Sequence, residues 1–314
     1  MDVSIVIPTF NRSGVLRRTL PVLADLRADG FDYEVVLVNN GSSDGTAGVL
    51  AEAAARWPRR IRPFNGPPTG GPSAPRNRGM REAAAPIVVI IDDDVLPEPD
   101  FAAAHWRFHR DHPAANVCAL GEAYVPDELL GDPMTLFHEY PYDDARAAGR
   151  LGGLFFWTCN VSGKRDFLLQ GGGFDEDWLC YEDVILGLEL EKRGMDLRFV
   201  PEARARHLHQ MSPDSLSRRA VLLGEWLAPL VRRFPDPAIK HRFGLLSGDI
   251  GPRRYLRRLA NRAAFRLLDT PPLMGIVRRL VEGRRRSRLS DFYYYVIFRR
   301  IMLAAYARAR RLTP

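Results

Sequence analysis

The sequence predicts an α/β protein in which a doubly wound sheet covered by helices is followed by a helical region. Two observations predict the sheet: short apolar, β-branched runs recur along the chain, and helical patterns separate them. A third observation predicts the helical region, because arginine-rich helical sequence without a convincing strand begins near residue 212. We therefore expect a first domain over residues 1–212 and a basic helical region over residues 213–314.

The predicted elements of the first domain alternate along the chain. Apolar runs predict strands at residues 3–8, 33–40, 60–64 and 87–91, and the stretches between them predict helices near 13–28, 43–57 and 76–84. Because these strands are continuously apolar, we expect them to be parallel and buried on both faces. Ligands bind such sheets at the carboxyl ends of the strands, so the segments "IPTFN", "VNNGSSD" and "IIDDD" should share one cleft.

Composition and length are those of a globular protein. The 314 residues can bury a sizeable core, and 46% of them are hydrophobic. Three cysteines without metal-ligand spacing, Cys118, Cys159 and Cys180, indicate a reducing compartment. The N-terminus does not resemble a signal peptide, and no uncharged apolar run approaches the roughly 20 residues that span a bilayer. We expect a cytoplasmic location, with the inner face of the membrane as a possible peripheral site.

The net charge of +7 is unevenly distributed. Residues 1–212 contain 22 Lys and Arg against 31 Asp and Glu, whereas residues 213–314 contain 23 against 7. Two parts of opposite charge indicate two different tasks.

Three consecutive acids, Asp92, Asp93 and Asp94, directly follow the buried run at residues 87–91. Oxygen ligands converging at a strand end suit a hard divalent cation, Mg²⁺ or Mn²⁺, which keeps positions open for the phosphates of a substrate. A solvated loop or a helix cap would use the same residues. The triplet alone leaves both interpretations open.

Six motifs in order carry a resemblance to a known family: "VSIVIPTFNR", "VLVNNGSSDGT", "APRNRGM", "IIDDDVLPEP", "CNVSGKRDFLLQGGGFDEDW" and "YEDVILGLELEKRG". Together they resemble the inverting family 2 glycosyltransferases, over roughly residues 1–210. The resemblance implies a GT-A-type, Rossmann-like mixed sheet and Mg²⁺ or Mn²⁺ as cofactor. It also implies a nucleotide-diphosphate sugar as donor, with UDP or dTDP favoured, and a glycan, glycolipid or small molecule as acceptor.

The resemblance also implies the nucleotide-binding residues. Asp92 and Asp94 would form the DxD pair that holds ribose and metal, with Asp93 assisting. Asn40 stands where many relatives have an Asp that bonds the pyrimidine, and its amide can still do so. The remaining expected contacts to the nucleotide are Pro8, Thr9, Asn11 and Arg76. A capped turn at Asn40 and a surface charge at Arg76 are the alternatives.

The second acidic pair, Glu182 and Asp183, should lie in the first turn of a helix, where the helix dipole keeps carboxylates ionised. By resemblance to the family's ED motif, Asp183 is the catalytic base and Glu182 supports it; complementing the helix terminus is the alternative. His207 fits the spacing of a third metal ligand in some relatives, with His209 in reserve. Trp157 is expected in the core, whereas Trp178 could stack on a sugar or be core.

Paired arginines and aromatic clusters recur in residues 213–314, as at Arg253–Arg254, Arg278–Arg279 and "DFYYYVIF". Basic amphipathic helices of this kind lie on anionic membrane surfaces. The same charge would also suit steering of an anionic acceptor, pairing with the acidic domain, or a homodimer contact. We expect no nucleic-acid partner, since no nucleic-acid-binding motif accompanies the charge.

Two other functions compete with sugar transfer as interpretations of the sequence. A sugar-phosphate nucleotidyltransferase would need a glycine-rich phosphate loop after the first strand, and "IPTFNRSG" has no such glycine cluster. A non-catalytic, membrane-associated scaffold would be expected to have lost its acids, yet Asp92, Asp94 and Asp183 are all present. A metal-dependent glycosyltransferase is the favoured prediction.

Overall fold

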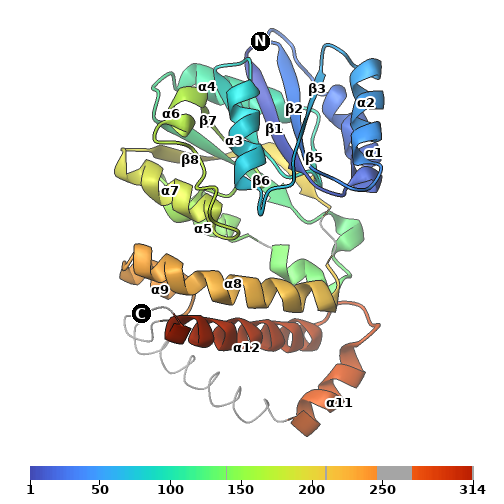
Figure 1. Cartoon of the computed structure of the whole chain (residues 1–314), viewed down its shortest axis with the longest axis vertical. Helices are drawn as coiled ribbons and strands as arrows, with labels where there is room; N and C mark the ends of the chain where they lie inside the picture. Colours follow the sequence, from blue (N-terminus) through green and yellow to red (C-terminus); the bar gives the residue numbers. More distant parts are fainter. Residues whose placement is uncertain (139, 209–210, 246–270, 313–314) are drawn as a thin grey trace. The chain divides into compact units, whose positions relative to one another are not determined.

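The computed structural model describes residues 1–312 except 139, 209–210 and 246–270. The chain forms two compact units (Figure 1). The first unit comprises Met1–Pro126 and His138–His209, and the second comprises Asp127–Phe137 and Gln210–Pro314. Each unit is described separately below.

An eight-stranded sheet forms the centre of the first unit, in the order β3-β2-β1-β4-β7-β6-β8-β5. Apolar, largely β-branched runs give the four strands predicted from the sequence, and these four strands pair with one another in parallel. These strands are β1 (Val3–Thr9), β2 (Tyr33–Asn40), β3 (Ile61–Gly66) and β4 (Ile87–Ile90).

The other half of the sheet is mixed. It contains β5 (Val95–Pro97), β6 (Val117–Tyr124), β7 (Val161–Lys164) and β8 (Asp196–His207). Strand β7 is antiparallel to both β4 and β6, and β5 is antiparallel to β8. The parallel arrangement expected from the apolar runs therefore holds only for the first half, and the mixed GT-A-type sheet implied by the resemblance is confirmed.

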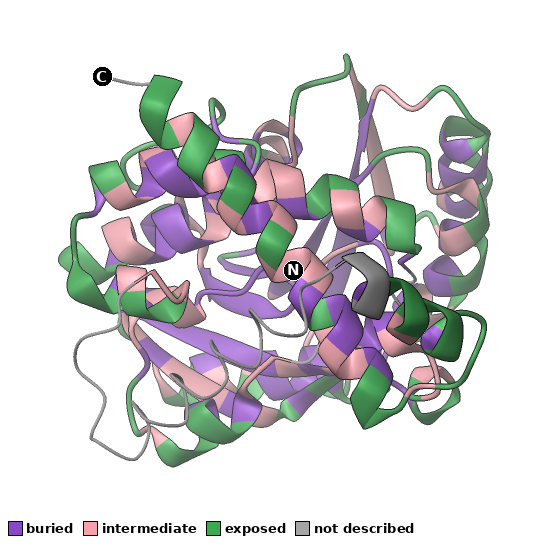
Figure 2. Cartoon of the chain, turned by 90° about the horizontal axis from the view of Figure 1, so that it is seen from below, coloured by how far each residue is buried: buried purple, intermediate pink, exposed green. Residues whose placement is uncertain are grey.

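Helices cover this sheet, and its central strands β1, β2 and β4 are buried almost throughout, as the purple strands in Figure 2 show. Helix α1 ends at Ala24, earlier than the predicted Ala28, and α2 begins at Thr46. The helices are α1 (Ser13–Ala24), α2 (Thr46–Arg56), α3 (Ser73–Glu82), α4 (Phe101–Asp111), α5 (Tyr142–Ala147), α6 (Arg165–Leu169) and α7 (Glu182–Lys192). The 3₁₀ turn η3 (Gly153–Phe155) packs against α7.

The second unit is helical where the structure describes it. Its elements are η1 (Asp127–Leu129), η2 (Pro133–His138), α8 (Pro213–Arg233), α9 (Pro237–Arg242), α11 (Pro271–Val281) and α12 (Arg288–Leu312). A capping box of Ser212 and Ser215 starts α8.

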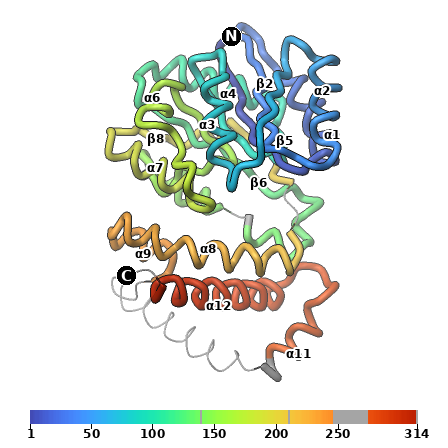
Figure 3. The backbone as a smooth tube through the Cα atoms, viewed as in Figure 1, coloured from blue at the N-terminus to red at the C-terminus, as the bar shows by residue number. Residues whose placement is uncertain are grey.

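Helices α8 and α12 lie side by side (Figure 3). A Cβ atom at Gly224 of α8 would overlap the carbonyl oxygen of Met302 in α12, so only glycine permits this close approach. Among the described helices, none is both long and apolar enough to cross a bilayer.

Candidate active site

The loops that follow β1 and β2 are bonded to each other at the carboxyl edge of the sheet. The Asn11 side-chain oxygen accepts a 2.8 Å hydrogen bond from the backbone of Ser43, and the Asn11 backbone donates to the Ser42 hydroxyl at 2.9 Å. Asn11 has φ of +53°, a left-handed conformation that asparagine tolerates better than most residues. Asn11 thus joins two of the three segments expected to share a cleft.

The acidic triplet lies beside the same loops. The buried Thr9 hydroxyl donates a 2.7 Å hydrogen bond to Asp93. Arg12, which is half exposed, places its guanidinium 3.5 Å from Asp93 and 3.8 Å from Asp94. Burial raises the pKa of Asp93 to about 7, although the hydrogen bond from Thr9 opposes the shift. Arg12 was not among the residues predicted from the sequence, because a single arginine in a polar loop has no distinguishing pattern.

Strand pairing brings a histidine to the acids. Strands β5 and β8 pair Val95 with His207, and the backbone of Leu208 donates to the Asp94 carbonyl at 2.8 Å. As a result, His207 Nε2 lies 3.4 Å from Asp94 Oδ1, and both side chains are buried. His209, the reserve candidate, lies outside the described residues.

Asp92, Asp94 and His207 form a group that could hold a metal ion, with one ligand atom from each within 4.8 Å of the others. Two carboxylates and one imidazole suit a divalent cation such as Mn²⁺ and leave coordination positions for phosphate oxygens and water. Asp92 is a third exposed, so the group is open on one side. The residues present therefore fit a divalent metal ion.

Arg76 of α3 connects the two acidic motifs. Its guanidinium donates to Asp92 Oδ1 at 2.8 Å and to Glu182 Oε1 at 2.6 Å, although Arg76 and Glu182 are 106 positions apart. Burial by itself would lower the pKa of Arg76, but the carboxylates of Asp92 and Glu182 raise it above its ordinary value. One buried arginine thus fixes the positions of two acids that come from different elements.

The next residue of α3 holds the loop that precedes α7. Asn77 accepts a hydrogen bond from the backbone of Phe174 and donates one to its carbonyl, both at 2.8 Å. Gly173 has φ of +77°, and a Cβ there would overlap the Asn77 side-chain oxygen. Glycine at 173 is therefore required for this contact.

Helix α7 begins at Glu182, as predicted, and both acids lie in its first turn. Tyr181, immediately before them, adopts a left-handed φ of +61°. Asp183 is half-buried and accepts a 2.7 Å hydrogen bond from the backbone of Val184. Burial, followed by the charge of Glu182, raises the pKa of Asp183 to about 7. A carboxylate of this kind can accept a proton near neutral pH.

The Asn40 amide is occupied by the neighbouring loop. Its oxygen accepts from the backbone and hydroxyl of Thr69 at 2.9 and 2.8 Å, and its nitrogen donates to the Thr69 carbonyl at 3.3 Å. Pro8 lies in β1, in register with Val38 of β2. Thus Pro8, Thr9, Asn11 and Asn40 all lie at or near the carboxyl ends of β1 and β2.

The two tryptophans do not differ much in burial. Trp157 is 4% exposed and its indole nitrogen donates to the Leu154 carbonyl at 2.9 Å, as expected for a core residue. Trp178 is 9% exposed.

Solved structures with the same architecture support the class of fold. A mannosyltransferase from Pyrobaculum calidifontis, solved with GDP-Man and Mn²⁺, superposes with a TM-score of 0.64 at 20% identity, covering 98% of this chain and 86% of that one. TarS residues 1–349 of S. aureus, solved with UDP, superposes with a TM-score of 0.54 at 17% identity, covering 99% and 90%. The fold is that of the GT-A glycosyltransferases.

The sequence comparison then gives the family. The profile of glycosyl transferase family 2 matches residues 4–171, more than half of the chain, and the chain belongs to this family. It is 31% identical over 223 residues to validoxylamine A glucosyltransferase of Streptomyces hygroscopicus subsp. limoneus, covering 62% of this chain and 49% of the relative. It is 32% identical over 267 residues to the uncharacterized glycosyltransferase YfnE of Bacillus subtilis, covering 68% and 66%. The chain spans about half the length of several curated relatives.

Proposed function

We propose that the protein is an inverting glycosyltransferase that moves a sugar from a nucleotide-diphosphate donor to an acceptor hydroxyl. The observation that carries the proposal is the juxtaposition of two acidic groups of different character. Asp92 and Asp94 lie with His207 in a group suited to a metal. Asp183, held in the neighbouring helix turn, has a pKa raised to about 7.

A divalent cation, Mg²⁺ or Mn²⁺, would be held by Asp92, Asp94 and His207. When bound, it would neutralise charge on the departing diphosphate. A hydrogen bond from Arg76 holds Asp92 in place, and a hydrogen bond from the Thr9 hydroxyl holds Asp93. These contacts keep the carboxylates preorganised for the donor.

Asp183 would take the proton from the acceptor hydroxyl as that oxygen attacks the sugar carbon and the diphosphate leaves. Its partly buried position disfavours the charged form, which makes it a stronger base than an ordinary aspartate. Glu182 is tied to Arg76 at 2.6 Å, so its part is to position the turn.

The nucleotide would lie on the edge formed by Pro8, Thr9, Asn11 and Asn40. UDP and dTDP are the donor nucleotides favoured by the sequence, whereas two of the solved neighbours contain GDP-Man or UDP. Family membership favours sugar transfer over the nucleotidyltransferase alternative. The acceptor would be a glycan, a glycolipid or a small molecule.

The test is calorimetric titration of the purified chain with UDP, dTDP and GDP, each with Mn²⁺ or with EDTA. We expect one nucleotide to bind with Mn²⁺ and not with EDTA. Asp92→Ala should abolish the Mn²⁺-dependent binding. Asp111→Ala, which removes an exposed acid at the end of α4, should bind as the unsubstituted protein does. Nucleotide binding that is indifferent to EDTA would contradict the metal assignment.

A further inference from the structure

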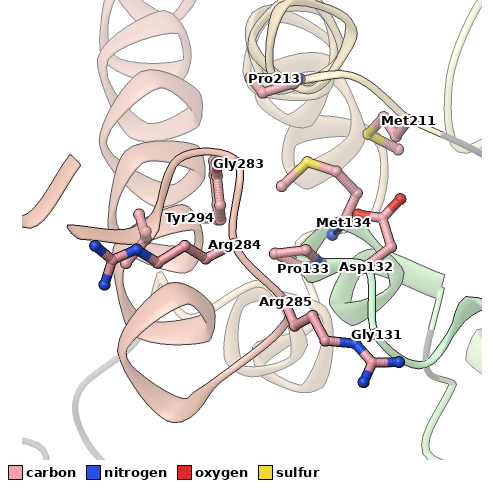
Figure 4. A pocket seen from close by; sticks show the side chains of 11 residues that line it. Gly131, Asp132, Pro133, Met134, Met211, Pro213, Gly283, Arg284, Arg285 and Tyr294 are labelled. Carbon is pink, nitrogen blue, oxygen red and sulfur yellow. Dashed lines mark hydrogen bonds between the residues drawn. The ribbon is translucent and has the colours of Figure 1, made fainter. Parts of the chain in front are cut away.

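A cavity of about 440 Å³ lies within the second unit (Figure 4). Three chain segments line it and leave it open to one side: residues 131–134, the start of α8, and the stretch from the end of α11 into α12. Its buried wall is apolar and is formed by Met134, Met211, Val281 and Tyr294. The volume falls within the range of small-ligand pockets, roughly 300–1,000 Å³.

Two arginines, Arg284 and Arg285, also line this cavity (Figure 4). Both are exposed, and neither forms an ion pair or side-chain hydrogen bond with any residue in the described part of the chain. Asp132, the acid that lines the cavity, accepts a hydrogen bond from the backbone of Met134 at 2.9 Å. The cavity therefore combines an apolar wall with one carboxylate and two guanidinium groups, and neither guanidinium forms an ion pair among the described residues.

The adjacent Arg286 behaves differently and fixes the loop. Its backbone donates to the Gly131 carbonyl at 2.7 Å, and its guanidinium donates to Asp291 at 2.9 Å and to Thr135 at 3.1 Å. Because Arg286 ties the loop to both residues 131–135 and α12, Arg284 and Arg285 are presented from an anchored backbone.

Three large apolar side chains are exposed in the segments that precede and follow these arginines. Ile276 and Leu280, one turn apart on α11, are 55% and 45% exposed, and Leu289 at the start of α12 is 43% exposed. Exposed arginines, Arg278, Arg279 and Arg288, alternate with them. Apolar side chains mixed with arginines are the composition of helices that lie at the surface of an anionic bilayer.

We propose that this cavity binds an anionic phospholipid at a membrane surface. The guanidinium groups of Arg284 and Arg285 point to opposite sides (Figure 4). Arg285, whose side chain lies beside Gly131, would bind the phosphate, and Arg284 would attract neighbouring anionic headgroups. The apolar wall would take part of an acyl chain. A free phosphate would contact the arginines but would bury none of the apolar wall. The proposal is independent of the sugar-transfer chemistry proposed for the first unit.

The first test is flotation of the full chain with vesicles of phosphatidylcholine, alone or mixed with phosphatidylglycerol. We expect binding to the mixed vesicles only. Arg284→Gln with Arg285→Gln should weaken it about thirtyfold, as estimated from the contribution of two arginines near an anionic surface. Arg308→Gln with Arg311→Gln removes the same charge at the far end of α12 and should cause a clearly smaller loss. Equal losses in both double variants, or equal binding to neutral vesicles, would overturn the cavity assignment.

The second test separates a lipid from a free phosphate. The full chain is titrated with dihexanoyl-phosphatidylglycerol, with glycerol phosphate and with inorganic phosphate. We expect saturable binding of the short-chain lipid, at least about tenfold tighter than that of either phosphate, because the chain buries apolar surface. Equal affinity for all three, or no saturable lipid binding by a protein whose circular dichroism shows it folded, refutes the proposal.

Discussion

Arg76 in the first unit and the pair Arg284 and Arg285 in the second unit carry their charges in opposite settings. In the first unit, Arg76 is 5% exposed in its side chain and lies between two carboxylates that it neutralises. In the second unit, Arg284 and Arg285 are exposed, with no acidic partner in the described part of the chain. The net charge of each unit therefore does not show which arginines are neutralised by acids and which are exposed. Buried charges fix the geometry of a site, whereas exposed charges are available to a partner.

The largest loss of folding free energy and of nucleotide binding is expected from Arg76→Met. The substitution leaves Asp92 and Glu182 without their shared partner, and uncompensated buried charge costs about 3–5 kcal/mol of folding free energy. Urea denaturation should show this loss, and Mn²⁺-dependent nucleotide binding should disappear. Arg76→Lys should recover only part of it, because one ammonium cannot bridge two carboxylates as a planar guanidinium does. A stable, active Arg76→Met protein would show that Arg76 is not needed to hold Asp92 and Glu182 in place.

Asp183→Asn should separate catalysis from stability. We expect kcat to fall about 10²–10⁴-fold, the usual contribution of a general base. Stability at pH 8 should not fall, because the folded protein disfavours the charged form of a group whose pKa is raised to about 7. In the unsubstituted enzyme, the rate should rise with pH up to about 7, as Asp183 loses its proton. Unchanged turnover in the variant would exclude Asp183 as the base.

Acid pH should lower the free energy of unfolding of the first unit, because the unit buries two neutral histidines. Burial lowers the pKa of His105 to about 4 and that of His109 to about 2, and both contact the Ser162 hydroxyl at 2.8 Å. Their stabilising contribution is therefore complete above pH 6.5 and is lost as pH falls below it, by up to about 1.4 kcal/mol per pH unit for each histidine.

Asp93 and Asp183 oppose this trend, since their raised pKa values favour the folded state as pH falls. The measurement is therefore a difference: urea denaturation of the wild type and of His105→Gln between pH 7.5 and 4.5. The wild type should lose stability relative to the variant as pH decreases. Parallel curves would show that His105 does not gain a proton on unfolding in this pH range.

The smallest change in stability is expected from Arg278→Gln in the second unit. Arg278 forms an exposed pair with Glu282, 2.7 Å apart on one face of α11. Exposed pairs of this spacing contribute little, because solvent screens them. Thermal denaturation should give the same Tm as the wild type. A clear decrease would mean that exposed charges in this unit also hold the fold together.

The parallel half of the sheet could be predicted from the sequence because its strands are encoded locally. Residues 3–8, 33–40 and 87–91 are apolar runs that have no alternative to burial in a sheet covered on both faces. Strand β7, with the sequence "VSGK", has no such pattern, and its position depends on pairing with β4 and β6. Long-range pairing of this kind cannot be deduced from local composition.

The candidate site shows the same division. The positions of Asp92, Asp94 and Asp183 at strand or helix ends could be predicted from the apolar run and the helical pattern beside them, and their roles in the site stay predictions. The bridge from Arg76 to Glu182 could not, since it joins residues 106 positions apart. Arg12 was missed because a single arginine in a polar loop has no distinguishing pattern.

Residues 127–137 have a consequence for how this protein could have evolved. They lie within the stretch that encodes the first unit, yet they belong to the second, where Thr135 and Gly131 bond Arg286. The polypeptide therefore passes from one unit to the other three times. A fusion at residue 210 alone would therefore supply only part of the second unit, and exchange of the complete unit between relatives would require both of its segments to be inherited together.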